Sequence, residues 1–226
     1  MRKIVVMAFV SVDGVMQAPG GPDEDRSGGF AHGGWVEPLW DEVAGAAVDE
    51  VFDAPFDLLL GRKTYDIFAS YWPFIQTDPS AADYEEGNAK IATRFDEVTK
   101  YVATHRPDSL AWQNTEWLGE DAVGRLRQLK REDGPPLLTQ GSSELVHTLL
   151  ANDLVDEVRL LVFPVLLGKG KRLFGEETKP AGLKLEKATV SPRGIVVARH
   201  VRAGDVATGT FAPEDPATDR KAQKPH

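Results

Sequence analysis

Residues 57–65 read Asp-Leu-Leu-Leu-Gly-Arg-Lys-Thr-Tyr, an apolar strand that passes through one glycine into the start of a helix. A glycine lets the backbone approach an anion closely, and the first turn of a helix presents unpaired N–H groups and the positive end of the helix dipole. The next two side chains add a guanidinium fork and an ammonium charge. A solvated basic turn is the competing interpretation. As a phosphate-binding turn, the stretch makes candidate cofactor ligands of Gly61, Arg62, Lys63 and Thr64.

A second stretch repeats this layout. Residues 136–150 read Pro-Leu-Leu-Thr-Gln-Gly-Ser-Ser-Glu-Leu-Val-His-Thr-Leu-Leu, again a short apolar strand, a glycine turn and a helix. The helix places Leu145, Val146, Leu149 and Leu150 on one face, which predicts that packing holds its first turn rigid. Two such turns in one α/β sheet would grip the two ends of a dinucleotide. The candidate ligands here are Gly141, Ser142, Ser143 and Glu144.

Residues 100–107, Lys-Tyr-Val-Ala-Thr-His-Arg-Pro, predict a third strand that ends in polar side chains. Its end carries a hydroxyl, an imidazole and a guanidinium group, from Thr104, His105 and Arg106. An arginine near such a strand end suits the 2′-phosphate of NADP, so the pattern favours NADPH over NADH.

Four motifs in order carry a family resemblance over nearly all of residues 2–203: Ser-Val-Asp-Gly at 11–14, Gly-Arg-Lys-Thr-Tyr at 61–65, Thr-Gln-Gly-Ser-Ser-Glu-Leu at 139–145, and Leu-Val-Asp-Glu at 154–157 leading to Pro-Val-Leu-Leu-Gly-Lys-Gly at 164–170. With these motifs the chain resembles the dihydrofolate-reductase-like superfamily. Within that superfamily it is similar to stand-alone relatives of the reductase domain of riboflavin biosynthesis proteins, the RibD C-terminal-like family.

The resemblance implies an NADPH-dependent reductase that transfers a hydride to a small heterocyclic substrate, as in 5-amino-6-(5-phosphoribosylamino)uracil reductase. It also implies a cytoplasmic homodimer. In such a protein Asp13 is a catalytic and substrate-contacting residue, and Gly14, Pro164 and Gly168 border the substrate cleft. The residues alone favour a plainer interpretation, in which the Asp-Gly pair forms a turn after the first strand. The basic side chains of residues 168–172 would suit contact with a substrate phosphate, and a solvated loop is an equally consistent interpretation.

Two alternatives remain open. The first is a dihydrofolate or pterin reductase, an enzyme that places one carboxylate from its first long helix in the substrate pocket. Four carboxylates lie on the corresponding helix here, and none lies in a motif that aligns with that position: Asp41, Glu42, Asp49 and Glu50. The second alternative is a nucleotide- or flavin-binding module without turnover. An assay of NADPH oxidation separates this module from an enzyme.

Composition fits one catalytic domain over residues 1–204 with a flexible extension over 205–226. The chain has 226 residues, 42% hydrophobic and 27% charged, and a formal charge of −9 that argues against nucleic-acid binding. It has no cysteine, which excludes disulfides and thiolate chemistry, and its five histidines show no metal-ligand spacing. No apolar run is long enough to cross a bilayer, so we expect no association with a membrane. From the absence of cysteine and of histidine ligand spacing we expect no metal.

The resemblance implies a three-layer α/β/α fold, and the order of the expected elements predicts a mixed, mostly parallel sheet that ends in an antiparallel hairpin. The residues expected in strands are 3–10, 57–61, 98–104, 136–140, 158–163, 183–190 and 194–202. Helices are expected over 35–52, 62–70 and 84–95, around 123–129, and up to 150. The hairpin turn is Ser-Pro-Arg-Gly at 191–194. The glycine-rich residues 11–35 predict a long loop that is functional or disordered.

Overall fold

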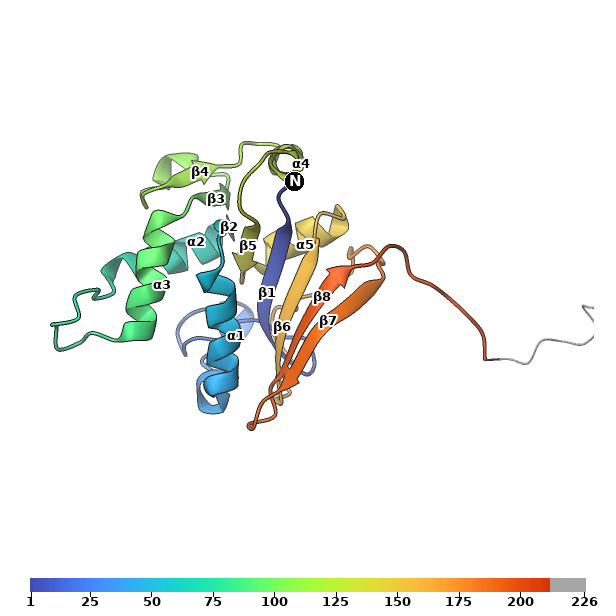
Figure 1. The fold of residues 1–226 in the computed structure, drawn as a ribbon, viewed down its shortest axis with the longest axis horizontal. Helices are drawn as coiled ribbons and strands as arrows, with labels where there is room; N and C mark the ends of the chain where they lie inside the picture. Colours follow the sequence, from blue (N-terminus) through green and yellow to red (C-terminus); the bar gives the residue numbers. More distant parts are fainter. Residues whose placement is uncertain (212–226) are drawn as a thin grey trace, which may run out of the picture.

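The computed structural model describes residues 1–211 and contains one mixed sheet in the order β4-β3-β2-β5-β1-β6-β8-β7 (Figure 1). The strands β1 to β6 pair in parallel, and β8 and β7 are antiparallel. The α/β fold with a C-terminal antiparallel hairpin is therefore confirmed. The strands are β1 (Ile4–Ser11), β2 (Asp57–Gly61), β3 (Lys100–Ala103), β4 (Thr115–Trp117), β5 (Leu137–Gln140), β6 (Glu157–Phe163), β7 (Leu183–Val190) and β8 (Val196–Arg202).

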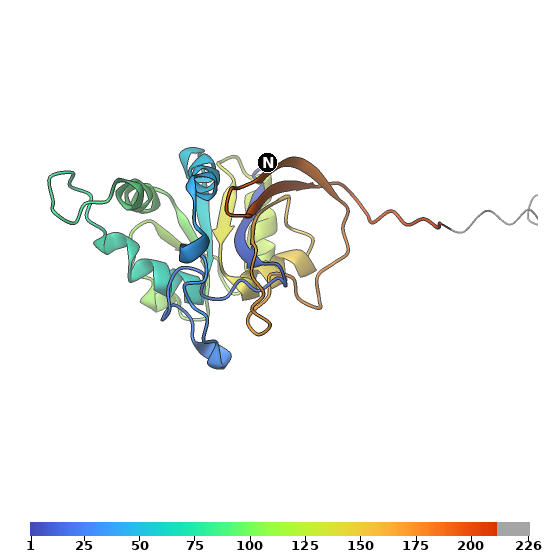
Figure 2. The same ribbon diagram turned by 90° about the horizontal axis from the view of Figure 1, so that it is seen from below.

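The helices cover both faces of the sheet, because successive strand residues point to opposite sides. In β2, Leu58 and Leu60 join the core beneath α1, α2 and α3, whereas Leu59 joins the core beneath α4 and α5. The helices are α1 (Glu42–Asp53), α2 (Arg62–Ala69), α3 (Glu86–Glu97), α4 (Ala122–Arg131) and α5 (Ser143–Ala151). The division at residues 1–204 stays a prediction, and residues 212–226 of the predicted extension lie outside the described residues. Residues 205–211 run away from the body (Figures 1 and 2).

The five helices begin in two different ways. A carboxylate caps α1, α3 and α4: Asp41 accepts from the Ala44 N–H, Glu85 from Gly87 and Asn88, and Asp121 from Gly124. In contrast, α2 and α5 begin directly after β2 and β5, and neither has a capping side chain. Their first turns keep the N–H groups that a capping side chain would otherwise occupy.

Two details of the predicted elements are wrong. The helix predicted over 35–52 begins at residue 42, because Pro38 lies in a short 3-10 turn and the side chain of Asp41 caps the helix behind it. The buried residues of the helix are Ala44, Val48, Val51 and Phe52. The strand β4 was not predicted, because three residues are too few to show a period.

The predicted hairpin turn is confirmed. The Ile195 N–H donates to the Ser191 Oγ over 3.0 Å, and Gly194 has a φ of 82°, which favours glycine. The turn joins β7 to β8. β7 is the edge strand of the sheet, and all of its residues are exposed.

Candidate functional site

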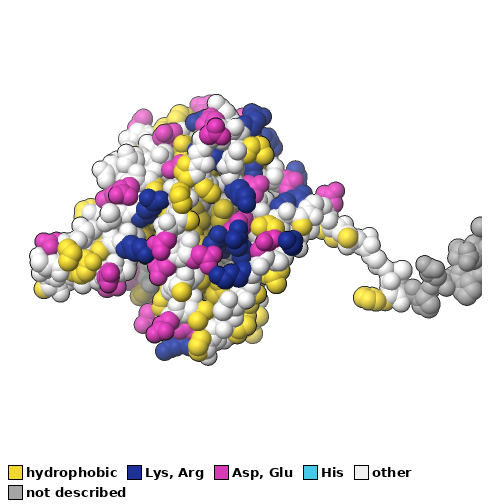
Figure 3. Space-filling view, viewed as in Figure 1, with side chains coloured by type: hydrophobic (Ala, Val, Ile, Leu, Met, Phe, Trp, Pro, Cys, Tyr) yellow, Lys and Arg dark blue, Asp and Glu magenta, His cyan; other side chains and the backbone are white. Residues whose placement is uncertain are grey.

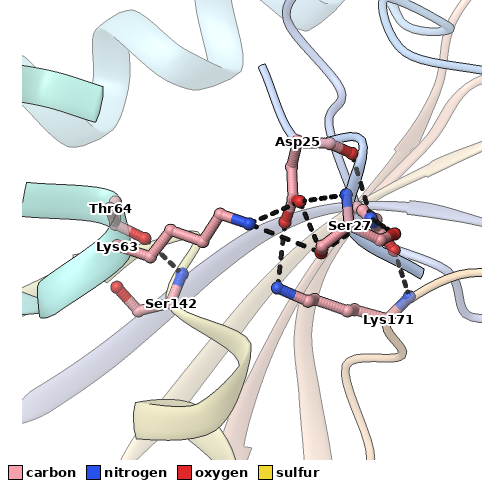
Figure 4. Close-up of polar contacts among 7 residues, drawn as sticks. Asp25, Ser27, Lys63, Thr64, Ser142 and Lys171 are labelled. Atoms are coloured by element: carbon pink, nitrogen blue, oxygen red, sulfur yellow. Dashed lines mark hydrogen bonds and ion pairs between the residues drawn. The ribbon is translucent and has the colours of Figure 1, made fainter. Parts of the chain in front are cut away.

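The two predicted phosphate-binding turns lie side by side, because β2 and β5 are neighbours in the sheet. Two hydrogen bonds join them directly. The Gly61 N–H donates to the Ser142 Oγ over 2.9 Å. The Ser142 N–H donates to the Thr64 Oγ1 over 3.0 Å (Figure 4). Gly141 has a φ of 81°, and a Cβ there would lie 3.4 Å from the Thr64 side chain. The turns thus form one continuous surface at the carboxyl ends of the strands.

The next neighbour in the sheet brings in the third predicted segment, since β3 pairs with β2. The Arg62 guanidinium binds the Asp66 carboxylate, with its Nη2 at 2.6 Å, and also donates to the Ser109 Oγ and the Arg106 carbonyl. The Arg106 side chain reaches the same carboxylate at 3.4 Å but remains 66% exposed. Arg62 therefore holds the loop after β3, while Arg106 remains accessible. Thr104 accepts from the Arg106 N–H, and His105 is exposed.

A buried carboxylate links the first turn of α2 to the loops after β1 and β6. Asp25 is 9% exposed and lies between two ammonium groups, the Lys63 Nζ at 2.5 Å and the Lys171 Nζ at 2.9 Å (Figure 4). The Ser27 hydroxyl also donates to it over 2.6 Å. Burial alone would raise the pKa of the Asp25 carboxyl, but the hydrogen bonds from Lys63, Ser27 and Lys171 lower this pKa well below its ordinary value. Asp25 is thus an ionised carboxylate that ties Lys63 of α2 to Lys171 of the loop after β6.

The glycine-rich loop is ordered by the same contacts. Gln17 is 4% exposed, and its Nε2 donates to the carbonyls of Asp25 and Ser27, each over 3.0 Å. Its Oε1 accepts the Lys171 N–H over 2.9 Å. The loop after β1 and the loop after β6 are therefore tied to each other as well as to α2. The site residues predicted from the sequence did not include Gln17, Asp25 or Ser27.

Asp13 ties the end of β1 to the loop after β6. Its carboxylate accepts from the Ser11 hydroxyl at 2.6 Å and from the N–H groups of Leu167 and Gly168 at 3.1 and 2.7 Å. The Arg172 guanidinium lies 3.7 Å from it and donates to the Asp13 carbonyl. The hydrogen bonds from Ser11 and Leu167 lower the pKa of the Asp13 carboxyl to about 2. Asp13 is ionised at neutral pH and orients the 164–172 loop, and its catalytic role stays a prediction.

We expect Asp13→Asn to destabilise the protein at pH 7, and we expect this cost to be much smaller near pH 2. The folded pKa of about 2 lies below the ordinary 3.8, so this carboxylate stabilises the fold fully above pH 3.8. The contribution is lost as the pH falls through the folded pKa. Unfolding by denaturant at both pH values measures it, and a difference between variant and wild type that persists unchanged at pH 2 would contradict the assignment.

The remaining predicted residues lie at the same end of the sheet. Gly14 has a φ of 81° in the turn after β1, and Pro164 and Gly168 are exposed in the loop after β6. On α5, Ser143 is buried and Glu144 is exposed in the first turn. A carboxylate there suits a hydroxyl donor better than a phosphate.

Two of the four carboxylates at and in α1 are engaged within the chain. Asp41 caps the helix and accepts from the Arg193 N–H at 3.2 Å, and Glu50 pairs with Arg159 and Lys187. Across residues 1–211, no three His, Asp or Glu side chains converge as metal ligands would. None of the helices in that range combines the length and the apolar composition that crossing a bilayer requires.

Comparison with known proteins gives one family. Residues 2–197 match the model of the RibD C-terminal domain. The uncharacterized protein YwjB of Bacillus subtilis is 27% identical over 202 residues, which cover 89% of this chain and 99% of YwjB.

Two solved structures share the fold. A putative riboflavin biosynthesis protein from Shewanella has a TM-score of 0.56 at 18% identity, with 89% of this chain and 99% of that chain covered. A diaminohydroxyphosphoribosylaminopyrimidine deaminase/5-amino-6-(5-phosphoribosylamino)uracil reductase from Thermotoga maritima has a TM-score of 0.55 at 14% identity. Its match covers 89% of this chain and 57% of that chain.

Proposed function

Because the chain belongs to the RibD C-terminal domain family, we propose that it is an NADPH-dependent reductase of a small heterocyclic substrate, similar to 5-amino-6-(5-phosphoribosylamino)uracil reductase. One observation carries the proposal. Two helices without capping side chains begin at neighbouring strand ends, and hydrogen bonds between Gly61, Thr64 and Ser142 join their first turns. Such paired helix N-termini attract the diphosphate of a dinucleotide.

The residues present fit NADPH. A glycine in each turn admits the close approach of an anion, and Lys63 and Arg106 add positive charge beside α2. Gly61, Thr64, Gly141, Ser142 and Ser143 would hold the diphosphate, and Arg106 the 2′-phosphate. The bound nicotinamide supplies the hydride, and the protein supplies position and exclusion of water.

The substrate would bind beside the loops that Asp13 and Asp25 hold. Asp13 aligns the N–H groups of Leu167 and Gly168, so it fixes the 164–172 border of the site. A carboxyl with a pKa of about 2 is a poor proton donor at neutral pH, which gives Asp13 a positioning role for substrate hydroxyls. The two lysines that hold Asp25 suit a substrate with a phosphate.

We expect Arg106→Ala to weaken NADPH binding about 10- to 100-fold and NADH binding less than about threefold, because only NADPH has the 2′-phosphate that a guanidinium recognises. Arg106 is preferable to Arg62 for this test, because Arg62 also holds the loop after β3. The dissociation constants follow from quenching of tryptophan fluorescence. Arg131→Ala, at the end of α4, is the matched control.

An equal loss of affinity for NADPH and NADH in Arg106→Ala would contradict recognition of the 2′-phosphate by Arg106. If the wild type binds neither nucleotide, the proposal that the protein is a reductase is wrong. If NADPH binds but is not oxidised with 5-amino-6-(5-phosphoribosylamino)uracil, dihydrofolate or other pyrimidine and pterin acceptors, the protein is a binding module.

A further inference from the structure

Charged side chains gather over the outer part of the sheet, on the face that Figure 3 shows. Glu157 of β6 accepts from the Arg159 Nε at 2.6 Å and the Arg199 Nη2 at 3.0 Å. Glu50 of α1 reaches Arg159 and Lys187 at 3.3 and 2.6 Å. Glu157 is the first residue of β6, so this network ties α1 to the sheet at the end opposite to the candidate site.

At the candidate site, the two helices that begin without a capping side chain each contact a loop. Lys63 of α2 binds Asp25 in the loop after β1, at 2.5 Å. On α5, the His147 Nε2 lies 2.9 Å from the carbonyl oxygen of Arg172, in the loop after β6. Both helices are therefore connected to the loops that border the site.

The contact to Arg172 fixes a proton on the His147 ring. A carbonyl oxygen only accepts hydrogen bonds, so the Nε2 carries the proton and donates to it. Gly175 lies against the same ring, where a Cβ would be 3.2 Å from the Cγ, Nδ1 and Cε1 atoms. A side chain at residue 175 would push the imidazole away. His147 is thus held by a hydrogen bond and by a close contact that only glycine allows.

The carbonyl that His147 binds lies where the loops after β1 and β6 join. The Met16 N–H donates to the Lys171 carbonyl over 2.8 Å, and the Leu173 N–H donates to the Gly14 carbonyl over 3.0 Å. These two hydrogen bonds flank Arg172 on both sides. A contact to the Arg172 carbonyl therefore positions both loops together.

α5 places this contact one helical turn from the proposed nucleotide site. Ser143, a candidate cofactor ligand, precedes His147 by four residues, so both lie on one face of α5, about 6 Å apart along its axis. Leu145, Val146 and Leu149 are buried in the core beneath the helix. Because this face is packed, we expect a restraint on the first turn to act on His147 as well.

We propose that His147 is a positioning residue that couples nucleotide binding at the start of α5 to the order of residues 164–172. The inference rests on the proposed function. A bound diphosphate would occupy the N–H groups of the uncapped first turn and restrain α5. The hydrogen bond to Arg172 would pass this restraint to the loop, so the substrate would bind more tightly after the nucleotide than before it.

Hydrogen exchange of the full chain, measured by mass spectrometry on peptides from residues 164–175, tests the coupling with and without saturating NADPH. In the wild type, NADPH should slow exchange in these peptides at least about fivefold, and in His147→Leu less than about twofold. His147→Gln should restore the protection, because the glutamine amide also offers an N–H donor. Thr148→Ala is the matched control and should match the wild type, because the Thr148 hydroxyl donates to the Glu144 carbonyl of the same helix.

A titration with NADPH shows that the loss of protection is not a loss of binding. Coupling is reciprocal, so the dissociation constant in His147→Leu should rise by no more than the factor by which NADPH protects the wild-type loop. If His147→Leu does not fold, Gly175→Ala replaces it. The added methyl group displaces the imidazole without a change in α5, and it should also reduce the protection.

Equal protection by NADPH in the wild type and in His147→Leu would overturn the coupling and leave the proposed function standing. A loss of protection that His147→Gln does not restore would overturn it as well, because the hydrogen bond would then not be the cause. A wild type that binds no NADPH would refute the proposed function and the coupling together.

Discussion

Replacing Asp25 with asparagine is expected to lower the melting temperature by about 5–10 °C, whereas Asp23→Asn in the same loop changes it by less than about 2 °C. Asp25 is 9% exposed between two lysines, so the variant leaves two cations without their shared carboxylate. Breaking such a pair costs about 2–3 kcal/mol when, as here, one partner is half exposed. Asp23 forms a pair with Arg26 that is 75% and 69% exposed, and exposed pairs contribute little.

The rate of trypsin cleavage measures the local effect of Asp25→Asn on the loop. Arg26 lies between Asp25 and Ser27, and the Gln17 side chain donates to the carbonyls of both neighbours. Cleavage after Arg26 should accelerate in Asp25→Asn relative to the wild type. If both the melting temperature and the cleavage rate of Asp25→Asn match those of the wild type, Asp25 does not hold the loop in place.

Replacing Gly33 with alanine is expected to destabilise the protein by about 3 kcal/mol or to displace the glycine-rich loop. A Cβ at this position would lie 2.5 Å from the Gly21 carbonyl oxygen and 2.8 and 2.9 Å from the carbonyl oxygen and Cα of Pro22. These are backbone atoms, so no side-chain rotation relieves the contact. The adjacent hydrogen bonds from Gly34 to Ala18 and from Val36 to Pro19 would be strained with it.

Gly21→Ala is the matched control, because a Cβ there meets nothing within 4 Å and the residue has no positive φ. Its free energy of unfolding should stay within about 0.5 kcal/mol of the wild type. Denaturant unfolding of the two variants gives the difference, and a titration with NADPH reports whether displacement of the loop disturbs the proposed cofactor site. Equal stability of the two variants would mean that the loop moves freely at residue 33.

Local chemistry made the elements of the fold predictable. Apolar runs bounded by glycine located β2 and β5, and Gly61 and Gly141 located the helix starts behind them. That these turns touch was not predictable in the same way. Their contact follows from β5 pairing beside β2, and strand order depends on long-range packing that no local pattern encodes.

The missed part of the site has a similar explanation. Asp25 ends an acidic run, Asp-Glu-Asp at residues 23–25, in which nothing in the sequence distinguishes the carboxylate that two lysines hold from its neighbours. Lys171 was recognised in a basic loop, but a solvated loop explained it equally well. Only the folded chain shows that one carboxylate receives lysines from positions 63 and 171.

The contacts around the strand ends divide the site into two parts. Gly61, Thr64 and Ser142 bind to one another, and the loops after β1 and β6 bind to each other through Asp13 and Gln17. The Lys63–Asp25 pair bridges α2 to these loops, and a hydrogen bond between the His147 Nε2 and the Arg172 carbonyl bridges α5 to them. Under the proposed function, the loops could therefore be exchanged for another substrate while the nucleotide-binding turns stay unchanged, provided that residues 63 and 25 change together.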